Sequence, residues 1–378
     1  MGRAKAINGW QKPKPRWLGY LLLLALALLA VWQQKSGYTN PPPAGEVALR
    51  VVFLPEGEQR AMSELAAALK GSKRTIDLAL LELNDTRLGY LLARAAGRGV
   101  RVRLFSERDH RGETLATLLA GARGQQSGRP RVSVREAKEK AEPVSAHCER
   151  LAGVEICYDD RPGLMHDKFA VCDEAVVFTG SANWSYNGLH KNDNDLLKLS
   201  GAPVVRLYHD AFESLWRRKP RAPAPATLEL ADGGQLAVYF SPSSGRRAVE
   251  RITAVLDAAE SEVWVAAFVL TSPEIIAALN RAADRGVAVR VLLERRNLGD
   301  SQEERLRDEV QVRPDANRYA MHLKTMVIDG KTVITGSFNF TRSAASRNDE
   351  NLLVLTSPQL ARRYKEKVWE LWRAAGGR

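Results

Sequence analysis

A motif-bearing stretch that occurs twice constrains this chain more than any other feature. One copy runs from His166 to Asn183 and the other from His322 to Asn339, at an offset of 156 residues. Both keep the spacing His-x-Lys-x4-Asp-x6-Gly-Ser-x-Asn. Side chains two apart share a strand face, so each His and Lys project together, and Asp329-Gly330 predicts a two-residue hairpin turn. Each copy therefore predicts a hairpin that gathers imidazole, ammonium, hydroxyl and carboxamide groups, a set suited to binding a phosphate.

The repeat extends through most of the chain, with residues 47–216 and 236–378 sharing one order of elements. Each copy reads strand, helix, strand, helix, then an Arg-Gly-Val sequence that ends the helix and opens another strand. This order predicts an α/β fold, with two similar lobes of mixed, largely parallel sheets flanked by helices and related by a pseudo-two-fold axis. Residues 217–235, basic and rich in Pro and Ala, are the predicted linker and lead-in between the lobes.

The first copy carries an insertion of about thirty residues at roughly Arg123 to Ala152, inferred from the changed offset between the copies. It contains several arginines and lysines and shows no strong periodicity before Val132. Two interpretations remain open, a solvated surface loop and a lid over the phosphate site.

The paired motifs resemble those of the phospholipase D superfamily, and the resemblance covers residues 47 to 374. It implies a phosphodiesterase in which one histidine attacks phosphorus and the other acts as the general acid and then as the base. In the family the first histidine is often the nucleophile. The implied catalytic residues are His166, His322, Lys168 and Lys324, and the implied phosphate-binding residues are Asn183, Asn339, Ser181 and Ser337.

Carboxylates near the motifs are expected to support the site. Asp173 and Asp329 fall at the hairpin turns, where a side chain usually bonds nearby backbone, so we interpret them as structural supports. By analogy with many relatives, Glu350 is the candidate for orienting a histidine. Its counterpart in the first copy is Asn194, and either flanking aspartate could substitute if the backbone bulges.

The residues of the motifs supply the positive charge and donors that a metal ion supplies elsewhere, so neither a metal nor another cofactor is expected. The net charge of +12 and the pI of about 9.7 indicate an anionic partner. A phospholipid membrane surface is the first hypothesis, with hydrolysis to phosphatidic acid and a head-group alcohol or transfer to another alcohol. A metal-independent endonuclease, a cardiolipin synthase-like transferase and a non-catalytic protein that binds anionic surfaces are the alternatives. The active site is expected to form within one chain, and the oligomeric state is not predicted.

The amino terminus has the features of a membrane signal. Residues 17–32 form an apolar run without charge, preceded by five basic residues and flanked by tryptophans. We expect residues 1–35 to form a cytoplasmic basic tail and signal anchor, and the Pro-rich residues 36–46 a spacer to an extracytoplasmic catalytic part. A secreted protein, cleaved near Ala25 to Ala27, is the alternative.

The chain has three cysteines, at positions 148, 157 and 172. In an extracytoplasmic protein Cys148 and Cys157 could close a small disulfide loop, although all three could equally be free. Cys172 is expected to be buried in the first motif strand. His147 lies beside Cys148, but the spacing fits no usual zinc site.

Overall fold

The computed structural model describes residues 45–218 and 222–376. The predicted signal anchor, most of the spacer and the centre of the linker lie outside these residues. Residues 42–378 form one compact unit that contains three hydrophobic cores. Within the described ranges, no helix has the length and apolar character needed to cross a membrane.

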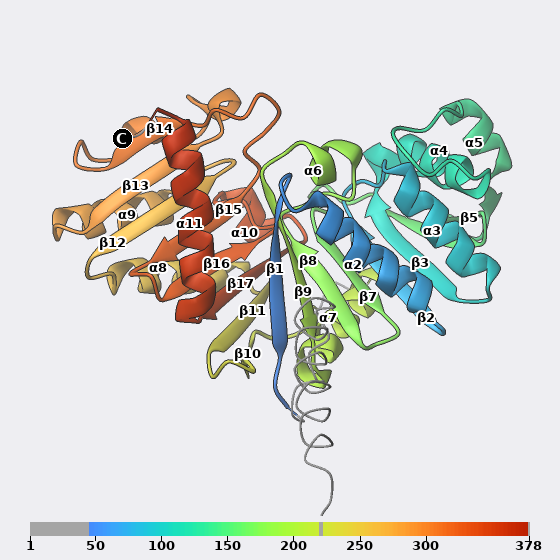
Figure 1. Cartoon of the computed structure of the whole chain (residues 1–378), viewed down its shortest axis with the longest axis horizontal. Coiled ribbons are helices and arrows are strands. Elements are labelled where there is room, and N and C mark those ends of the chain that lie inside the picture. Colours follow the sequence, from blue (N-terminus) through green and yellow to red (C-terminus); the bar gives the residue numbers. More distant parts are fainter. Residues whose placement is uncertain (1–44, 219–221, 377–378) are drawn as a thin grey trace, which may run out of the picture. The chain divides into compact units, whose positions relative to one another are not determined.

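The first lobe is a nine-stranded sheet with helices on both faces (Figure 1). Glycine ends the helix before the third strand, as its Arg-Gly-Val sequence predicts, and Gly99 has a positive φ of 86°. The elements are β1 (Ala48–Leu54), α2 (Glu58–Gly71), β2 (Thr75–Leu80), α3 (Thr86–Gly97), β3 (Arg101–Glu107), η1 (Arg108–His110), α4 (Arg111–Ala122), α5 (Val134–Lys140), β4 (Glu142–Pro143), β5 (Cys148–Leu151), β6 (Val154–Asp159), β7 (Lys168–Cys172), β8 (Val176–Gly180), α6 (Tyr186–His190), β9 (Asn194–Ser200) and α7 (Ala202–Trp216).

The second lobe repeats this order around an eight-stranded sheet, without counterparts of α4, α5, β4 and β5 and with β10 as an added edge strand. Its first strand falls inside the predicted lead-in. The elements are β10 (Ala226–Glu229), β11 (Gln235–Ser241), α8 (Gly245–Asp257), β12 (Glu262–Ala267), α9 (Pro273–Asp284), β13 (Ala288–Leu293), η2 (Arg295–Asn297), η3 (Glu303–Arg305), β14 (Gln311–Pro314), β15 (Lys324–Ile328), β16 (Thr332–Gly336), α10 (Arg342–Ser346), β17 (Glu350–Thr356) and α11 (Pro358–Ala374).

Both sheets are mixed, which confirms the predicted α/β class, but parallel pairs do not dominate. The strand orders are β1-β9-β8-β7-β2-β3-β6-β5-β4 and β10-β11-β17-β16-β15-β12-β13-β14. Only β2-β3, β3-β6, β12-β13 and β13-β14 are parallel. Crossover connections join these pairs, through α-helices except between β13 and β14, whereas the motif hairpins and the opening and closing strands add antiparallel neighbours. The expectation of largely parallel sheets is therefore wrong.

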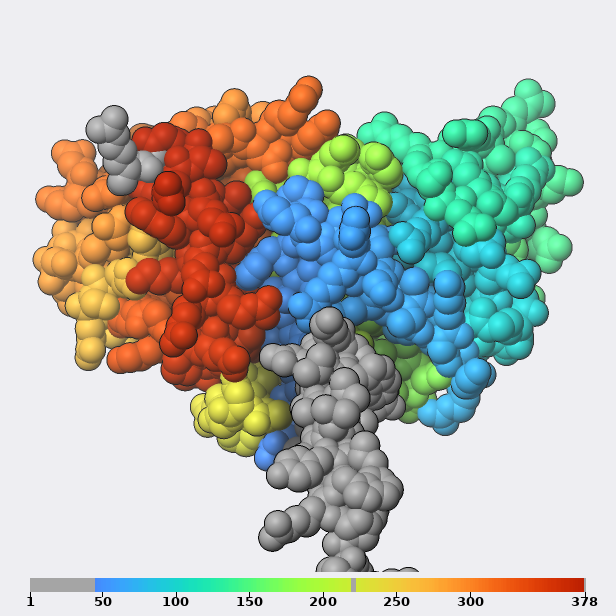
Figure 2. All heavy atoms as spheres, in the orientation of Figure 1, coloured from blue at the N-terminus to red at the C-terminus, as the bar shows by residue number. Residues whose placement is uncertain are grey.

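The lobes share a core between their sheets. It contains residues of both, including Tyr208 of α7, Phe240 of β11 and Trp372 of α11. Each outer face has a separate core covered by helices, α2 and α3 on the first lobe and α8 and α9 on the second. The last helix, α11, lies beside the first strand, β1, on the face in Figure 2, and Lys367 Nζ donates to the Glu56 carboxylate at 2.8 Å. The shared core makes each lobe dependent on the other for burial.

The insertion extends the edge of the first sheet. It forms α5, β4 and β5, and β5 is separated from the hairpin strand β7 by three strands. At a strand spacing of about 4.8 Å this is roughly 19 Å, so the insertion does not cover the hairpins. Cys148 and Cys157 pair directly across β5 and β6 and form a disulfide, and Cys172 is buried and free.

Both predicted hairpins form, with a turn longer than expected. The strands β15 and β16 pair Ile328 with Thr332, so the turn holds three residues rather than two. Lys331 N still bonds Ile328 O at 3.0 Å, as a two-residue turn requires, and Lys331 forms a bulge. Asp329 and Gly330 both have positive φ, 51° and 61°.

Candidate active site

The two motif histidines lie where the lobes meet. Each lies two residues before the start of a hairpin strand and is buried, with His166 6% and His322 7% exposed. The backbone N–H of each histidine donates to a carbonyl of the opposite lobe. His166 N donates to Asp349 O at 3.0 Å, and His322 N donates to Asp193 O at 2.9 Å. This exchange of equivalent contacts brings the two motifs into one site within one chain.

Glu350 of the second lobe holds the first histidine. Its Oε2 lies 2.7 Å from His166 Nδ1 and accepts a hydrogen bond from Ser337 Oγ at 2.8 Å. Asn348 Nδ2 donates to the other oxygen, Oε1, at 3.2 Å. Glu350 is fully buried, and burial raises its pKa to about 8. The expected orienting carboxylate is thus Glu350, and the histidine it orients is His166.

Asn194 of the first lobe holds the second histidine. Its Oδ1 lies 2.9 Å from His322 Nδ1 and accepts from Ser181 Oγ at 2.9 Å, while its Nδ2 donates to Gly188 O at 2.9 Å. Asn194 stays in register with Leu54 on the neighbouring strand, so the backbone does not bulge to bring in a flanking aspartate. The two sites therefore differ by one ionisable group, a carboxyl group on His166 and a carboxamide on His322.

These partners fix the histidine tautomers. Asn194 Oδ1 is an acceptor, so the facing His322 Nδ1 carries the proton, and Glu350 in its ionised form requires the same of His166. The lone pair of each neutral ring is then on Nε2. Burial, followed by the charges of Lys168 and Lys324, lowers the pKa of both histidines well below 6.5.

Ser181 and Ser337 do not take the predicted phosphate-binding role. Both are fully buried, and their hydroxyls donate to Asn194 and Glu350. The preceding glycine turns the chain, since Gly336 has a φ of 131° and a Cβ there would lie 2.3 Å from Asn351 O. The serines are supports for the histidine partners.

Both lysines are buried on the same side of the strand as their histidines, as the spacing predicts. Lys168 Nζ donates to His166 O and Lys324 Nζ to His322 O, each at 2.6 Å. Burial lowers the pKa of Lys168 to about 8 and that of Lys324 well below its usual 10.5. An anion bound between the two ammonium groups would raise the pKa of both lysines again.

Carboxyl groups oppose the effect of burial on the pKa of each lysine. Glu350 acts on both lysines, Asp167 and Glu82 act on Lys168, and Asp195 acts on Lys324. Asp195 Oδ2 accepts from Tyr364 OH at 2.6 Å, and Asp167 Oδ1 from Asn351 Nδ2 at 2.7 Å. The sequence did not lead us to predict a role beside the lysines for Asp167 or Asp195. The repeat offset of 156 residues aligns Asp195 with Asn351, the residue that bonds Asp167, and this alignment could have indicated both acids.

The motif asparagines remain candidates for binding phosphate. Asn183 and Asn339 are half-buried, and in each the side-chain oxygen is buried without a hydrogen-bond partner. Asn183 Nδ2 donates to Glu82 Oε1 at 2.9 Å. Glu82 also lies near His110 and Glu113, and their ligand atoms are within 4.8 Å of one another.

The motif aspartates are structural, but their partners are distant in sequence. Asp173 accepts hydrogen bonds from the backbone N–H groups of residues 73–75 at 2.7 to 2.9 Å. Asp329 accepts from those of residues 260–262 at 2.8 to 3.0 Å. Each ties its hairpin turn to the start of the adjacent strand, β2 or β12, rather than to nearby backbone.

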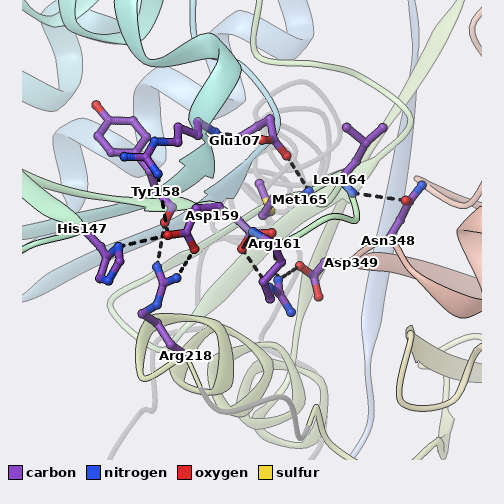
Figure 3. Close-up of polar contacts among 12 residues, drawn as sticks. Glu107, His147, Tyr158, Asp159, Arg161, Leu164, Met165, Arg218, Asn348 and Asp349 are labelled. Atoms are coloured by element: carbon purple, nitrogen blue, oxygen red, sulfur yellow. Dashed lines mark hydrogen bonds and ion pairs between the residues drawn. The ribbon is translucent and has the colours of Figure 1, made fainter.

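A polar clasp holds the loop that carries His166 (Figure 3). Arg161 donates from Nε and Nη2 to Asp159 of its own lobe at 2.7 and 3.0 Å, and also bonds Asp349 of the other lobe. The equivalent position in the second lobe is Asn317, whose Nδ2 donates to Asp193 at 2.8 Å. In each lobe this contact joins the loop before the histidine to an aspartate of the opposite lobe. That aspartate directly precedes the residue that bonds the histidine, Glu350 or Asn194.

Comparison with known proteins identifies related sequences. A family described as "Cardiolipin synthase, PLD-like domain" matches residues 65–216 and 252–372. A Rickettsia bellii protein named phospholipase D is 36% identical over 183 residues, which is 48% of this chain and 82% of that protein. Human mitochondrial cardiolipin hydrolase is 30% identical over 165 residues, 44% of this chain, and the alignment spans only 54% of the human protein.

A solved structure supports the two-lobed fold. Phosphatidylserine synthase of Haemophilus influenzae superposes with a TM-score of 0.60 at 13% identity, over 86% of each chain. At this identity the likeness concerns the fold alone.

Proposed function

Because the chain belongs to the phospholipase D superfamily of phosphodiesterases, we propose that it hydrolyses phospholipids to phosphatidic acid and a head-group alcohol through a phosphohistidine. The reciprocal pairing of the histidines carries this proposal. Glu350 holds His166, and Asn194 holds His322, each at Nδ1 and each from the opposite lobe. Both Nε2 atoms are thereby left for proton transfer or attack on phosphorus.

The difference between the two partners, an ionisable carboxyl group and a neutral carboxamide, supports separate roles for the histidines. A phosphohistidine bonded through Nε2, with its proton on Nδ1, is a cation, which a carboxylate at Nδ1 stabilises. A general acid must release its proton, and a neutral carboxamide at Nδ1 stabilises the protonated ring less. His166 with Glu350 is thus the nucleophile, and His322 with Asn194 is the general acid.

In the first step His166 Nε2 forms a bond to phosphorus, and the bond from phosphorus to the head-group oxygen breaks. The Nε2 proton of the His322 cation goes to that oxygen, which leaves as an alcohol. Lys168 and Lys324 stabilise the negative charge that develops on the phosphoryl oxygens, and Asn183 and Asn339 add donors.

In the second step neutral His322 takes a proton from water. The hydroxide oxygen bonds phosphorus, the nitrogen–phosphorus bond breaks, and phosphatidic acid leaves. His166 returns to its neutral form and His322 to its cation, so the cycle closes without any other reactant. An alcohol in place of water gives transfer instead of hydrolysis.

The names of the relatives support lipid as the substrate, since they refer to cardiolipin hydrolase and phospholipase D. The matching family description favours a cardiolipin synthase-like transferase as one alternative. The net charge of +12 favours a metal-independent endonuclease as another. We extend the proposal to an anchored, extracytoplasmic enzyme, on the sequence of residues 1–35.

The test uses a fragment spanning residues 42–378, the compact unit with its own cores, in EDTA. It is incubated separately with vesicles of phosphatidylcholine, vesicles containing cardiolipin, single-stranded DNA and RNA. Release of head group or phosphatidic acid, abolished by His166→Ala, supports the proposal. Cleavage of nucleic acid alone refutes the lipid assignment. Activity that EDTA removes points instead to a metal at Glu82, His110 and Glu113.

A further inference from the structure

Exposed apolar side chains concentrate at one edge of the sheets. We define the catalytic edge as the edge where β2, β3, β6, β12, β13 and β14 end and the two motif histidines lie. Four of the six exposed large hydrophobic side chains of the described residues are on segments that join elements there. They are Val144 (44% exposed), Leu164 (46%), Leu298 (38%) and Tyr319 (37%).

The topology places these four residues. Val144 is in the turn between β4 and β5, which lies at this edge because Cys148 pairs with Cys157 near the end of β6. Leu164 and Tyr319 are on the loops that enter β7 and β15, and Leu298 follows the end of β13. In Figure 1, α6, which joins β8 to β9 at the same edge, lies above these two strands.

A fifth residue, Val134 (38% exposed), opens α5. Its side chain lies against Gly112, two residues beyond η1, which follows the end of β3. The sixth, Trp369, is in α11 and packs against Trp264. Exposed apolar residues scattered singly need no explanation, but five gathered at the edge that holds the histidines do.

Exposed arginines lie next to two of these apolar residues in the sequence. Arg295 and Arg296 precede Leu298, and Arg318 precedes Tyr319. Guanidinium groups bind phosphate oxygens well.

We propose that the catalytic edge docks on the surface of an anionic lipid bilayer, with Val144, Leu164, Leu298 and Tyr319 entering the interface and the arginines contacting lipid phosphates. Three of the four are aliphatic and offer no ring for a base to stack on, which favours lipid over single-stranded nucleic acid. This docking surface rests on the proposed function, because a bilayer is the expected partner only if the substrate is a phospholipid. The docked edge would present the histidines to phosphates in the plane of the membrane.

The test measures cosedimentation of the 42–378 fragment with vesicles of phosphatidylcholine, alone or with phosphatidylglycerol. Binding is expected to rise with the phosphatidylglycerol fraction and fall with salt. The double variant Val144→Gln, Leu298→Gln should bind about tenfold more weakly, because two aliphatic side chains no longer enter the interface. Arg318→Gln should weaken binding about fivefold.

Arg101→Gln is the matched control, because Arg101 is an exposed arginine at the opposite end of β3. It should bind vesicles like the unaltered fragment, and all variants should keep its melting temperature. Equal vesicle binding by the double variant and the unaltered fragment overturns the proposal, as does binding of single-stranded DNA without binding of vesicles.

Hydrolysis of a soluble diester, bis(p-nitrophenyl) phosphate, separates this inference from the proposed function. We expect unchanged hydrolysis by the docking variants. Diester hydrolysis without vesicle binding refutes the docking surface and leaves the phosphodiesterase intact. Vesicle binding that the double variant weakens, without any diester hydrolysis, refutes the phosphodiesterase and leaves the surface intact.

Discussion

At the scale of single residues, Glu350 and Asn194 occupy equivalent positions in the two lobes but differ in charge. Replacing Glu350 by Gln keeps the shape and removes the carboxylate that stabilises a cationic His166. We expect the rate of phosphoenzyme formation to fall about a hundredfold or more, measured by rapid quenching in a single turnover. Asn194→Ala, which removes the neutral partner of His322, should lower the rate of phosphoenzyme formation by a smaller factor. Equal losses in the two variants would contradict the assignment of His166 as nucleophile.

The same pair of residues predicts the pH dependence of the reaction. Burial and the two lysine charges lower the pKa of His322 below 6.5, so its protonated, acid form is lost at a lower pH than for an exposed histidine. The alkaline limb of kcat/KM should therefore fall below pH 6.5. Asn194→Asp places a carboxylate beside His322, which raises its pKa and should move this limb to higher pH. An unmoved limb would mean that another group sets it.

At the scale of elements, Asp329 joins the second hairpin to the start of β12 through three backbone N–H groups. Asp329→Ala should lower the free energy of unfolding by about 1–3 kcal/mol at pH 7, because these donors lose their acceptor. Chemical denaturation measures the loss, and Asp173→Ala should give a similar one in the first lobe. Hydrolysis of a soluble diester per folded molecule should change little.

The loss of stability should itself depend on pH. Partial burial raises the pKa of Asp329, but hydrogen bonds from residues 260–262 outweigh it and bring the pKa to about 2, below the ordinary 3.8. A lowered pKa stabilises the fold above pH 3.8, and this contribution disappears as the pH falls to 2. The difference between Asp329→Ala and the unaltered protein should shrink over that interval.

The elements show how far the sequence predicts this molecule. The repeat predicts both hairpins, both lobes and the placement of each motif lysine on the same side of its strand as the histidine, because strand and helix periodicities are local. It does not predict that Glu350 meets His166 or that Asn194 meets His322, since these contacts depend on how the lobes associate. Nor does it predict that the Ser337 hydroxyl, expected to bind phosphate, donates to Glu350 instead.

At the scale of the whole molecule, two lobes of nearly the same design form one site with different halves. A pair of first lobes would place a carboxamide on both histidines, and a pair of second lobes would place a carboxylate on both. Neither arrangement joins one histidine stabilised as a cation to one that readily releases its proton. The duplicated chain therefore allows an asymmetry that two identical lobes cannot have.

Activity should accordingly require both lobes together. A protease site introduced at residues 219–221 and then cleaved should leave activity intact, because the shared core, with Tyr208, Phe240 and Trp372, holds the lobes together without the linker. Separating the fragments in urea and refolding them apart should abolish hydrolysis of a soluble diester, and refolding them as a mixture should restore it. Full activity in either fragment alone would show that the cross-lobe bonds to His166 and His322 are not needed for catalysis.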